Sequence, residues 1–151
     1  MRKIESQRIY LKYGLLIAMA LIAFFLLVRV FGLHENIWLR LFNGVIIGYG
    51  IYAVIKKKKQ MEKYEFDYFS GFITGVSAGI IATGIFVLFM AVYMFHLDTA
   101  FADDLLGNWM GNYNHGPGIL VFVLAVEGAS SSLILSLTFM QKFKQSKNIA
   151  F

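Results

Sequence analysis

The sequence predicts an all-α integral membrane protein, a bundle of four transmembrane helices, from three observations. Hydrophobic residues make up 58% of the 151 residues and charged residues only 15%, whereas a soluble domain has about 25% charged residues. Four long apolar stretches follow one another, at residues 13–31, 37–55, 68–95 and 118–140. Each is close to or above the roughly 20 residues with which a helix crosses about 30 Å of hydrocarbon. None alternates apolar and polar residues as membrane β-strands do, so we expect a single membrane domain made of helices.

The four stretches differ in how clearly they predict a span. The third contains no charged residue, while the first contains only Arg29 and the fourth only Glu127. The second is weaker, because Arg40 and Asn43 lie near its start. It is still predicted to cross the membrane, because it lies too close in the sequence to the first and third stretches to be anything other than a span.

Lysine and arginine residues gather at alternate connections between these stretches. One group precedes the first stretch, one lies between the second and third, and one follows the fourth, whereas the other two connections contain neither residue type. Positive residues are retained on the cytoplasmic side, so both termini are predicted to be cytoplasmic. The three groups are Arg2, Lys3, Arg8 and Lys12; Lys56, Lys57, Lys58, Lys59 and Lys63; and Lys142, Lys144 and Lys147.

The run Lys56–Lys59 is interpreted first as a topological signal and second as a surface for anionic lipid. The net charge of +5 does not indicate a nucleic-acid partner, because the basic residues lie beside helix ends. The predicted partners are therefore the lipid bilayer and anionic lipid, with a second copy of the chain or another membrane protein as further candidates.

Small residues recur every four positions in two of the stretches. Gly71, Gly75 and Gly79 share one face of the third predicted helix, and Gly44 and Gly48 share one face of the second. Inside a membrane, helices associate through close packing of such faces, because lipid supplies no hydrophobic driving force between them. We predict that both faces pack against a helix, within the bundle or between protomers; a ligand-lined groove is the alternative.

The long connection at 96–117 is predicted to contain a short amphipathic helix on the outer surface of the membrane. Phe101, Leu105 and Trp109 recur every four residues, which is typical of a helix that lies in the interface with one face in lipid. Asp98 and Thr99 are candidates to cap this helix.

Glu127 lies near the middle of the fourth predicted span. An acidic residue there costs about 2.5–3.5 kcal/mol, and such residues usually face the bundle and carry function. Ser130 and Ser131 follow one turn later, and we expect this polar stripe to face Asn43 or the Ser and Thr residues of the third stretch. Glu127 is the first candidate for a functional residue.

Three interpretations of Glu127 are open. The favoured one is a neutral, hydrogen-bonded carboxyl group that supports the structure, since removal from water disfavours the charged form. The second is a proton- or cation-binding group in a transport pathway. The third is an ion pair with Arg29, Arg40 or a partner subunit.

No motif of a known catalytic, metal or cofactor site is present. The absence of cysteine excludes disulfides, thiol catalysis and thiolate metal sites, and there is no phosphate-binding loop or dinucleotide fingerprint. Residues 75–79 have the outline Gly-x-Ser-x-Gly, but without the strand–turn–helix context of a nucleophile. We therefore predict a non-enzymatic accessory or structural protein without cofactor; the alternative is a small oligomeric transporter or channel that uses Glu127.

Three short patterns carry a resemblance to a known family. They are Tyr13-Gly14-Leu15, Phe66-Asp67-Tyr68 with Gly71 and Gly75, and Glu127-Gly128. In these patterns and in its layout the chain resembles a family of small four-span bacterial membrane proteins, the domain of unknown function 4199. The resemblance implies four spans in the bacterial cytoplasmic (inner) membrane, and it brings no activity, cofactor or site residue with it.

Overall fold

A computed structural model describes residues 2–32, 37–98, 101 and 116–143, and these residues are almost entirely helical. The all-α prediction is confirmed, because this part of the chain contains four long α-helices and no strand. The elements are α1 (Arg2–Val30), α2 (Ile37–Glu62), the 3-10 turn η1 (Lys63–Glu65), α3 (Tyr68–Val92), the π-helical turn η2 (Tyr93–Leu97) and α5 (Gly118–Phe143).

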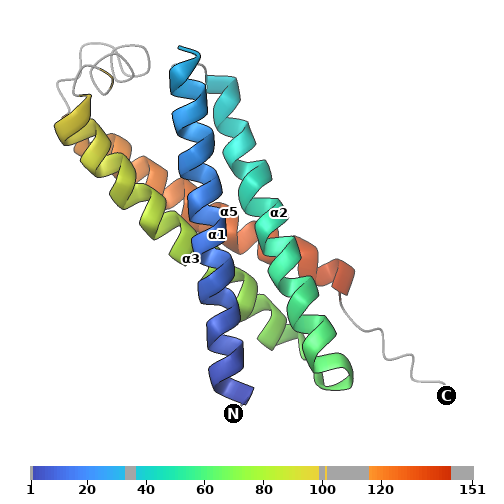
Figure 1. The fold of residues 1–151 in the computed structure, drawn as a ribbon. Coiled ribbons are helices and arrows are strands. Elements are labelled where there is room, and N and C mark those ends of the chain that lie inside the picture. Colours follow the sequence, from blue (N-terminus) through green and yellow to red (C-terminus); the bar gives the residue numbers. More distant parts are fainter. Residues whose placement is uncertain (1, 33–36, 99–100, 102–115, 144–151) are drawn as a thin grey trace.

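The four long helices form two antiparallel pairs. In Figure 1, α1 and α2 run side by side in opposite directions, and α3 and α5 form a second pair that crosses behind them. α3 packs against each of the other three long helices, as α2 also does. The buried residues of α3 recur every three or four positions and are mostly Gly, Ala and Thr, so one narrow side of this helix accepts close neighbours.

Local residues explain where the helices begin and end. Asp67 caps α3, because its side chain accepts a hydrogen bond from the Phe69 backbone N–H at 3.2 Å. Gly32, with φ +67°, follows α1 in the left-handed conformation that commonly ends a helix. α1 and α2 are longer than the apolar stretches that predict them, because Lys, Arg, Gln and Glu continue a helix readily outside the apolar part.

The described residues include three segments long and apolar enough to cross a membrane. They are Arg8–Val30, Tyr68–Leu97 and Gly118–Phe143. By length and composition, these segments support a multi-pass membrane protein.

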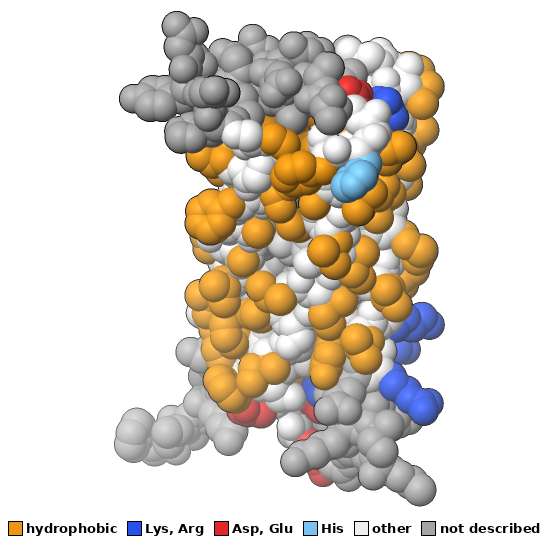
Figure 2. Space-filling view, turned by 90° about the vertical axis from the view of Figure 1, so that its left-hand side faces the viewer, with side chains coloured by type: hydrophobic (Ala, Val, Ile, Leu, Met, Phe, Trp, Pro, Cys, Tyr) orange, Lys and Arg blue, Asp and Glu red, His pale blue; other side chains and the backbone are white. Residues whose placement is uncertain are grey.

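Large apolar side chains cover the outside of the bundle. Leu27, Tyr49, Leu88 and Phe122, one from each long helix, are all more than half exposed. Figure 2 shows such side chains spread over the middle of one face, with charged side chains toward the two ends. A water-soluble monomer rarely exposes a contiguous apolar surface of this extent, so the belt is suited to hydrocarbon.

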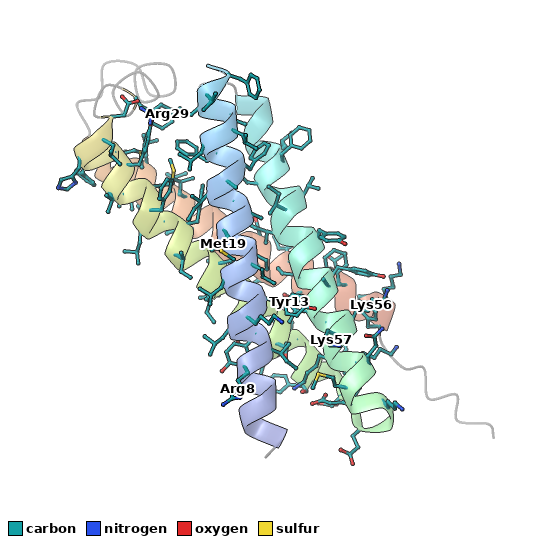
Figure 3. All side chains as sticks on the ribbon, viewed as in Figure 1. Arg8, Tyr13, Met19, Arg29, Lys56 and Lys57 are labelled. Atoms are coloured by element: carbon teal, nitrogen blue, oxygen red, sulfur yellow. The ribbon has the colours of Figure 1, made fainter. Side chains whose placement is uncertain are left out.

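Basic residues mark one end of the bundle. Figure 3 shows Arg8, Lys56 and Lys57 at this end and Arg29 at the opposite end. The end of α2 meets the end of α5 there, since Lys59 Nζ donates to the Phe143 carbonyl oxygen at 3.1 Å.

Candidate functional site

Two small-residue faces, one on α3 and one on α5, pack in register. A Cβ atom placed on Gly75 would lie only 2.7 Å from Ser136 Oγ, a distance that real Cβ contacts do not show. Because the helices are antiparallel, each four-residue step along α3 matches a four-residue step back along α5. The glycine face of α3 therefore lies within the bundle. The pairs are Gly71–Met140, Gly75–Ser136, Gly79–Ser132 and Thr83–Gly128.

This register orients Glu127. Gly128 faces α3, and the residue before it is turned about 100° around the helix, which brings Glu127 to a cavity shared with α2. The cavity measures about 170 Å³, and Asn43 and Gly44 of α2 line it together with Glu127 and Ser131. The structure thus brings three of the predicted polar residues to one place. Leu21, Leu41, Ile47, Thr83, Phe86, Leu124 and Gly128 complete the lining.

The predicted polar residues differ in burial. Asn43 and Ser131 are half-buried, whereas Glu127 and Ser130 are exposed, and Ser130 does not line the cavity. Glu127 therefore lies at the mouth of the cavity, on the side of α5 that faces Asn43, as predicted for the polar stripe. At about 1.5 Å per residue it is roughly 13 Å along α5 from Gly118, which is still deep within the apolar belt.

Thr83 is the polar residue of this cavity that was not predicted from the sequence. It is only 7% exposed, and its hydroxyl oxygen has no hydrogen-bond partner among the residues that the structure describes. The hydroxyl groups of Thr74 and Ser132, by contrast, donate to carbonyl oxygens one turn earlier, at 2.8 and 2.7 Å. The four-residue spacing that marks Gly71, Gly75 and Gly79 continues to position 83, and that spacing could have identified Thr83.

An open groove continues from this cavity between α2 and α5. Gly44 and Gly48 form its floor, and Leu41, Gly44 and Ser131 line both the cavity and the groove. A Cβ on Gly44 would meet nothing within 4 Å, whereas one on Gly48 would reach ordinary contact with Leu135, at 3.7 Å. The predicted small-residue face of α2 is therefore only partly occupied. The walls are Leu41, Val45, Tyr49, Tyr52, Ile134, Leu135 and Phe139.

The lysine run at the end of α2 is not uniform. Lys56 and Lys57 are exposed. Lys58 is 4% exposed and pairs with Glu62 at 2.8 Å, while Lys59 lies 5.6 Å from the centre of the Phe143 ring. Only part of the run is thus open to lipid headgroups.

A second polar cluster lies at the opposite end of the bundle. Arg29 of α1 pairs with Asp98 at 3.4 Å, and the same carboxylate oxygen accepts from the Tyr93 hydroxyl at 3.0 Å. Asp98 also accepts from the Phe101 backbone N–H at 3.2 Å, as expected of a capping residue. The predicted interfacial helix, beyond Phe101, lies outside the described residues, as does the Arg40 side chain. Arg29 is thus held by an acidic group at its own end of the bundle, well away from Glu127.

The cavity combines oxygen-bearing groups of three kinds: a carboxylate, an amide carbonyl and two hydroxyl groups. Such hard oxygen donors suit a proton or a small cation. Among the described residues of the lining, Glu127 is the only ionisable side chain.

Comparison with protein-family models, with curated proteins and with solved structures finds no match for this chain. The family resemblance stated above therefore stays a prediction, and functional inference rests on the geometry just described.

Proposed function

We propose that this chain is a non-enzymatic, four-span protein of the bacterial cytoplasmic membrane, with an accessory or structural role. The observation that carries the proposal is the apolar belt bounded by a basic end. Positive residues are retained in the cytoplasm, so Arg8, Lys56 and Lys142 support a cytoplasmic position for that end and for both termini. The resemblance to the four-span bacterial family points the same way.

α2 is proposed as a further span, in addition to the three segments long and apolar enough to cross a membrane. It is 26 residues long, about 39 Å at 1.5 Å per residue, which exceeds the hydrocarbon thickness. It lies antiparallel beside α1 (Figure 1) and exposes Leu41, Val45 and Tyr49 within the apolar belt. An outward face of this kind is what a lipid-contacting helix requires.

Single cysteines test this topology cleanly, because the chain has none of its own. We expect Phe31→Cys and Leu97→Cys to react with a membrane-impermeant maleimide in intact cells, and Lys57→Cys, which α2 separates from position 31, to react only after permeabilisation. All three positions are exposed, so a difference in labelling reports the side of the membrane. Labelling of positions 31 and 57 from the same side would refute α2 as a span.

A transporter or channel is the second candidate function, and the cavity favours it. Glu127, Asn43, Ser131 and the unbonded Thr83 hydroxyl converge from three helices at a depth where polar groups are costly. In this alternative the carboxylate binds and releases a proton or monovalent cation.

Reconstituted liposomes separate the two functions. Transport predicts proton or cation flux with wild-type protein, loss of that flux to the protein-free level in Glu127→Gln, and unchanged flux in Ser130→Ala. Ser130 is a matched control, because it lies one turn from Glu127 but outside the cavity lining. The accessory role predicts protein-free flux for all three proteins, together with unaltered folding in Glu127→Gln.

A further inference from the structure

We propose that the groove between α2 and α5 binds one anionic phospholipid, with an acyl chain over Gly44 and Gly48 and the headgroup phosphate at Lys56 and Lys142. This inference rests on the membrane placement proposed above and adds a specific ligand to it.

The shape of the groove suits an acyl chain. Its floor is two glycines on one face of α2, and its walls are apolar side chains from both helices. Gly44 has open space above it, so nothing in the described structure fills this part of the groove. From Gly44 to Tyr52 the groove runs roughly 12 Å along α2 at 1.5 Å per residue, parallel to the direction in which lipid chains run. The groove also opens sideways within the apolar belt, where lipid is the surrounding solvent.

Apolar walls alone would not select one lipid over another, because lipid chains are as apolar as the side chains they touch. Selectivity has to come from the polar end of the groove. There Tyr52, a wall residue, contacts the rings of Phe139 and Phe143 at centroid distances of 5.5 and 5.3 Å. The groove therefore ends in an aromatic cluster, which is typical of the level at which headgroups begin.

Lysines surround this aromatic cluster. Lys142 Nζ lies 5.5 Å from the centre of the Tyr52 ring, and Lys59 Nζ lies 5.6 Å from that of Phe143. Lys56 follows Tyr52 by one turn on the same face of α2 and is exposed (Figure 3). The nearby Glu62 is already paired with Lys58. The charge at this end of the groove is thus positive and complementary to a phosphate group at the cytoplasmic surface.

Native mass spectrometry of the full chain in neutral detergent tests the site. We expect wild-type protein to retain phosphatidylglycerol at least about tenfold better than phosphatidylcholine of the same chains, since each lysine near the surface strengthens anionic binding by several-fold. Lys56→Gln combined with Lys142→Gln should remove that preference. Lys12→Gln combined with Lys57→Gln removes the same charge from two other exposed lysines, one on α1 and one turned about 100° from Lys56 around α2, and should preserve it. Equal effects of the two double variants would refute the headgroup assignment.

A second pair of variants tests the chain-binding part. Gly44→Leu should reduce lipid retention about tenfold by filling the groove. Gly84→Leu should not, although its Cβ also meets nothing within 4 Å, because position 84 lies outside the groove lining. Neither change meets a neighbour at Cβ, so both variants should fold. Unchanged lipid retention in Gly44→Leu would overturn the proposal. If the wild-type protein is a dimer and Gly44→Leu is a monomer that retains lipid, the proposal also fails, and the groove is assigned to a second copy of this chain.

Glycerol 3-phosphate separates a lipid site from a simple phosphate site. We expect no retention of this headgroup fragment at concentrations that saturate the lipid, and equal retention would contradict a role for the acyl chain. A failure of the proposed membrane placement can be told apart from a failure of the lipid site. If the protein is not in the membrane, it would be recovered without detergent extraction. Failure of the lipid site alone would leave an extracted protein with no preference for anionic lipid.

Discussion

Gly79→Ala is expected to lower the free energy of unfolding by about 2–3 kcal/mol, the upper part of the range for overpacking a close-packed core. The new methyl group would lie 2.6 Å from the Cβ of Ser132. Ser132 is fully buried and cannot swing aside freely, because its hydroxyl donates to the Gly128 carbonyl oxygen at 2.7 Å. The helices therefore have to separate, and separation weakens every contact along the α3–α5 seam, the row of pairs from Gly71–Met140 to Thr83–Gly128. Unfolding in a mixed detergent series, followed by circular dichroism, measures the change.

Gly84→Ala is the matched control for this substitution. It adds the same methyl group to the same helix, but at a position with nothing within 4 Å. Alanine is the better helix former by up to about 1 kcal/mol, so this variant should be as stable as the wild type or slightly more so. If Gly79→Ala and Gly84→Ala unfold at the same detergent fraction, the α3–α5 seam is not where the structure places it.

The double variant Gly79→Ala with Ser132→Gly tests the pairing itself. Removing the Ser132 side chain makes room for the new methyl group, so we expect the double variant to recover at least half of the stability lost in Gly79→Ala. Residues in contact give non-additive effects of this kind, whereas separated residues do not. Purely additive losses, with Ser132→Gly measured alone, would contradict a direct contact between the two positions.

The sequence predicts the glycine seam on one side only. Four-residue spacing marks Gly71, Gly75 and Gly79 as a packing face, and the structure has them on one. The sequence does not reveal which face of α5 packs against these glycines, because Ser130, Ser131 and Ser132 are chemically the same. In the structure, Ser130 is exposed, Ser131 lines the cavity and Ser132 is fully buried. Their roles depend on how α5 is rotated against α3, which is set by contacts between residues distant in the chain.

The same reason explains why the sequence does not predict how exposed Glu127 is. The predicted polar stripe does face Asn43, but Gly128 occupies the contact with α3 and leaves Glu127 at the mouth of the cavity. Lys58 is a comparable case. The run Lys56–Lys59 predicts a surface for anionic lipid, yet Lys58 is 4% exposed and paired with Glu62. In both cases one helix turn decides the environment, and periodicity alone does not fix that rotation.

Asp98→Ala is expected to destabilise the end of the bundle at which Arg29 lies by about 2 kcal/mol. Most of this cost comes from the Tyr93 hydroxyl. Tyr93 is 1% exposed and donates to Asp98 at 3.0 Å, and a buried donor left without its acceptor costs about 1–3 kcal/mol. The Arg29–Asp98 ion pair adds less, because the two side chains are 40% and 25% exposed and solvent screens them. Unfolding in mixed detergent again gives the measurement.

Two further substitutions distinguish the hydrogen bond from the charge. Asp98→Asn removes the negative charge and keeps one acceptor oxygen in place of the two that accept from Tyr93 and from the Phe101 N–H. It should therefore lose less stability than Asp98→Ala, which keeps neither. Adding Tyr93→Phe to Asp98→Ala removes the unsatisfied hydroxyl and should restore part of the stability. The ring of Tyr93 also contacts Phe25 and the Arg29 guanidinium, with centroid distances of 5.0 and 4.7 Å, and phenylalanine preserves both contacts. If Asp98→Asn proves as damaging as Asp98→Ala, and Tyr93→Phe brings no recovery, then the charge of Asp98 and not its hydrogen bond to Tyr93 ties α1 to the end of α3.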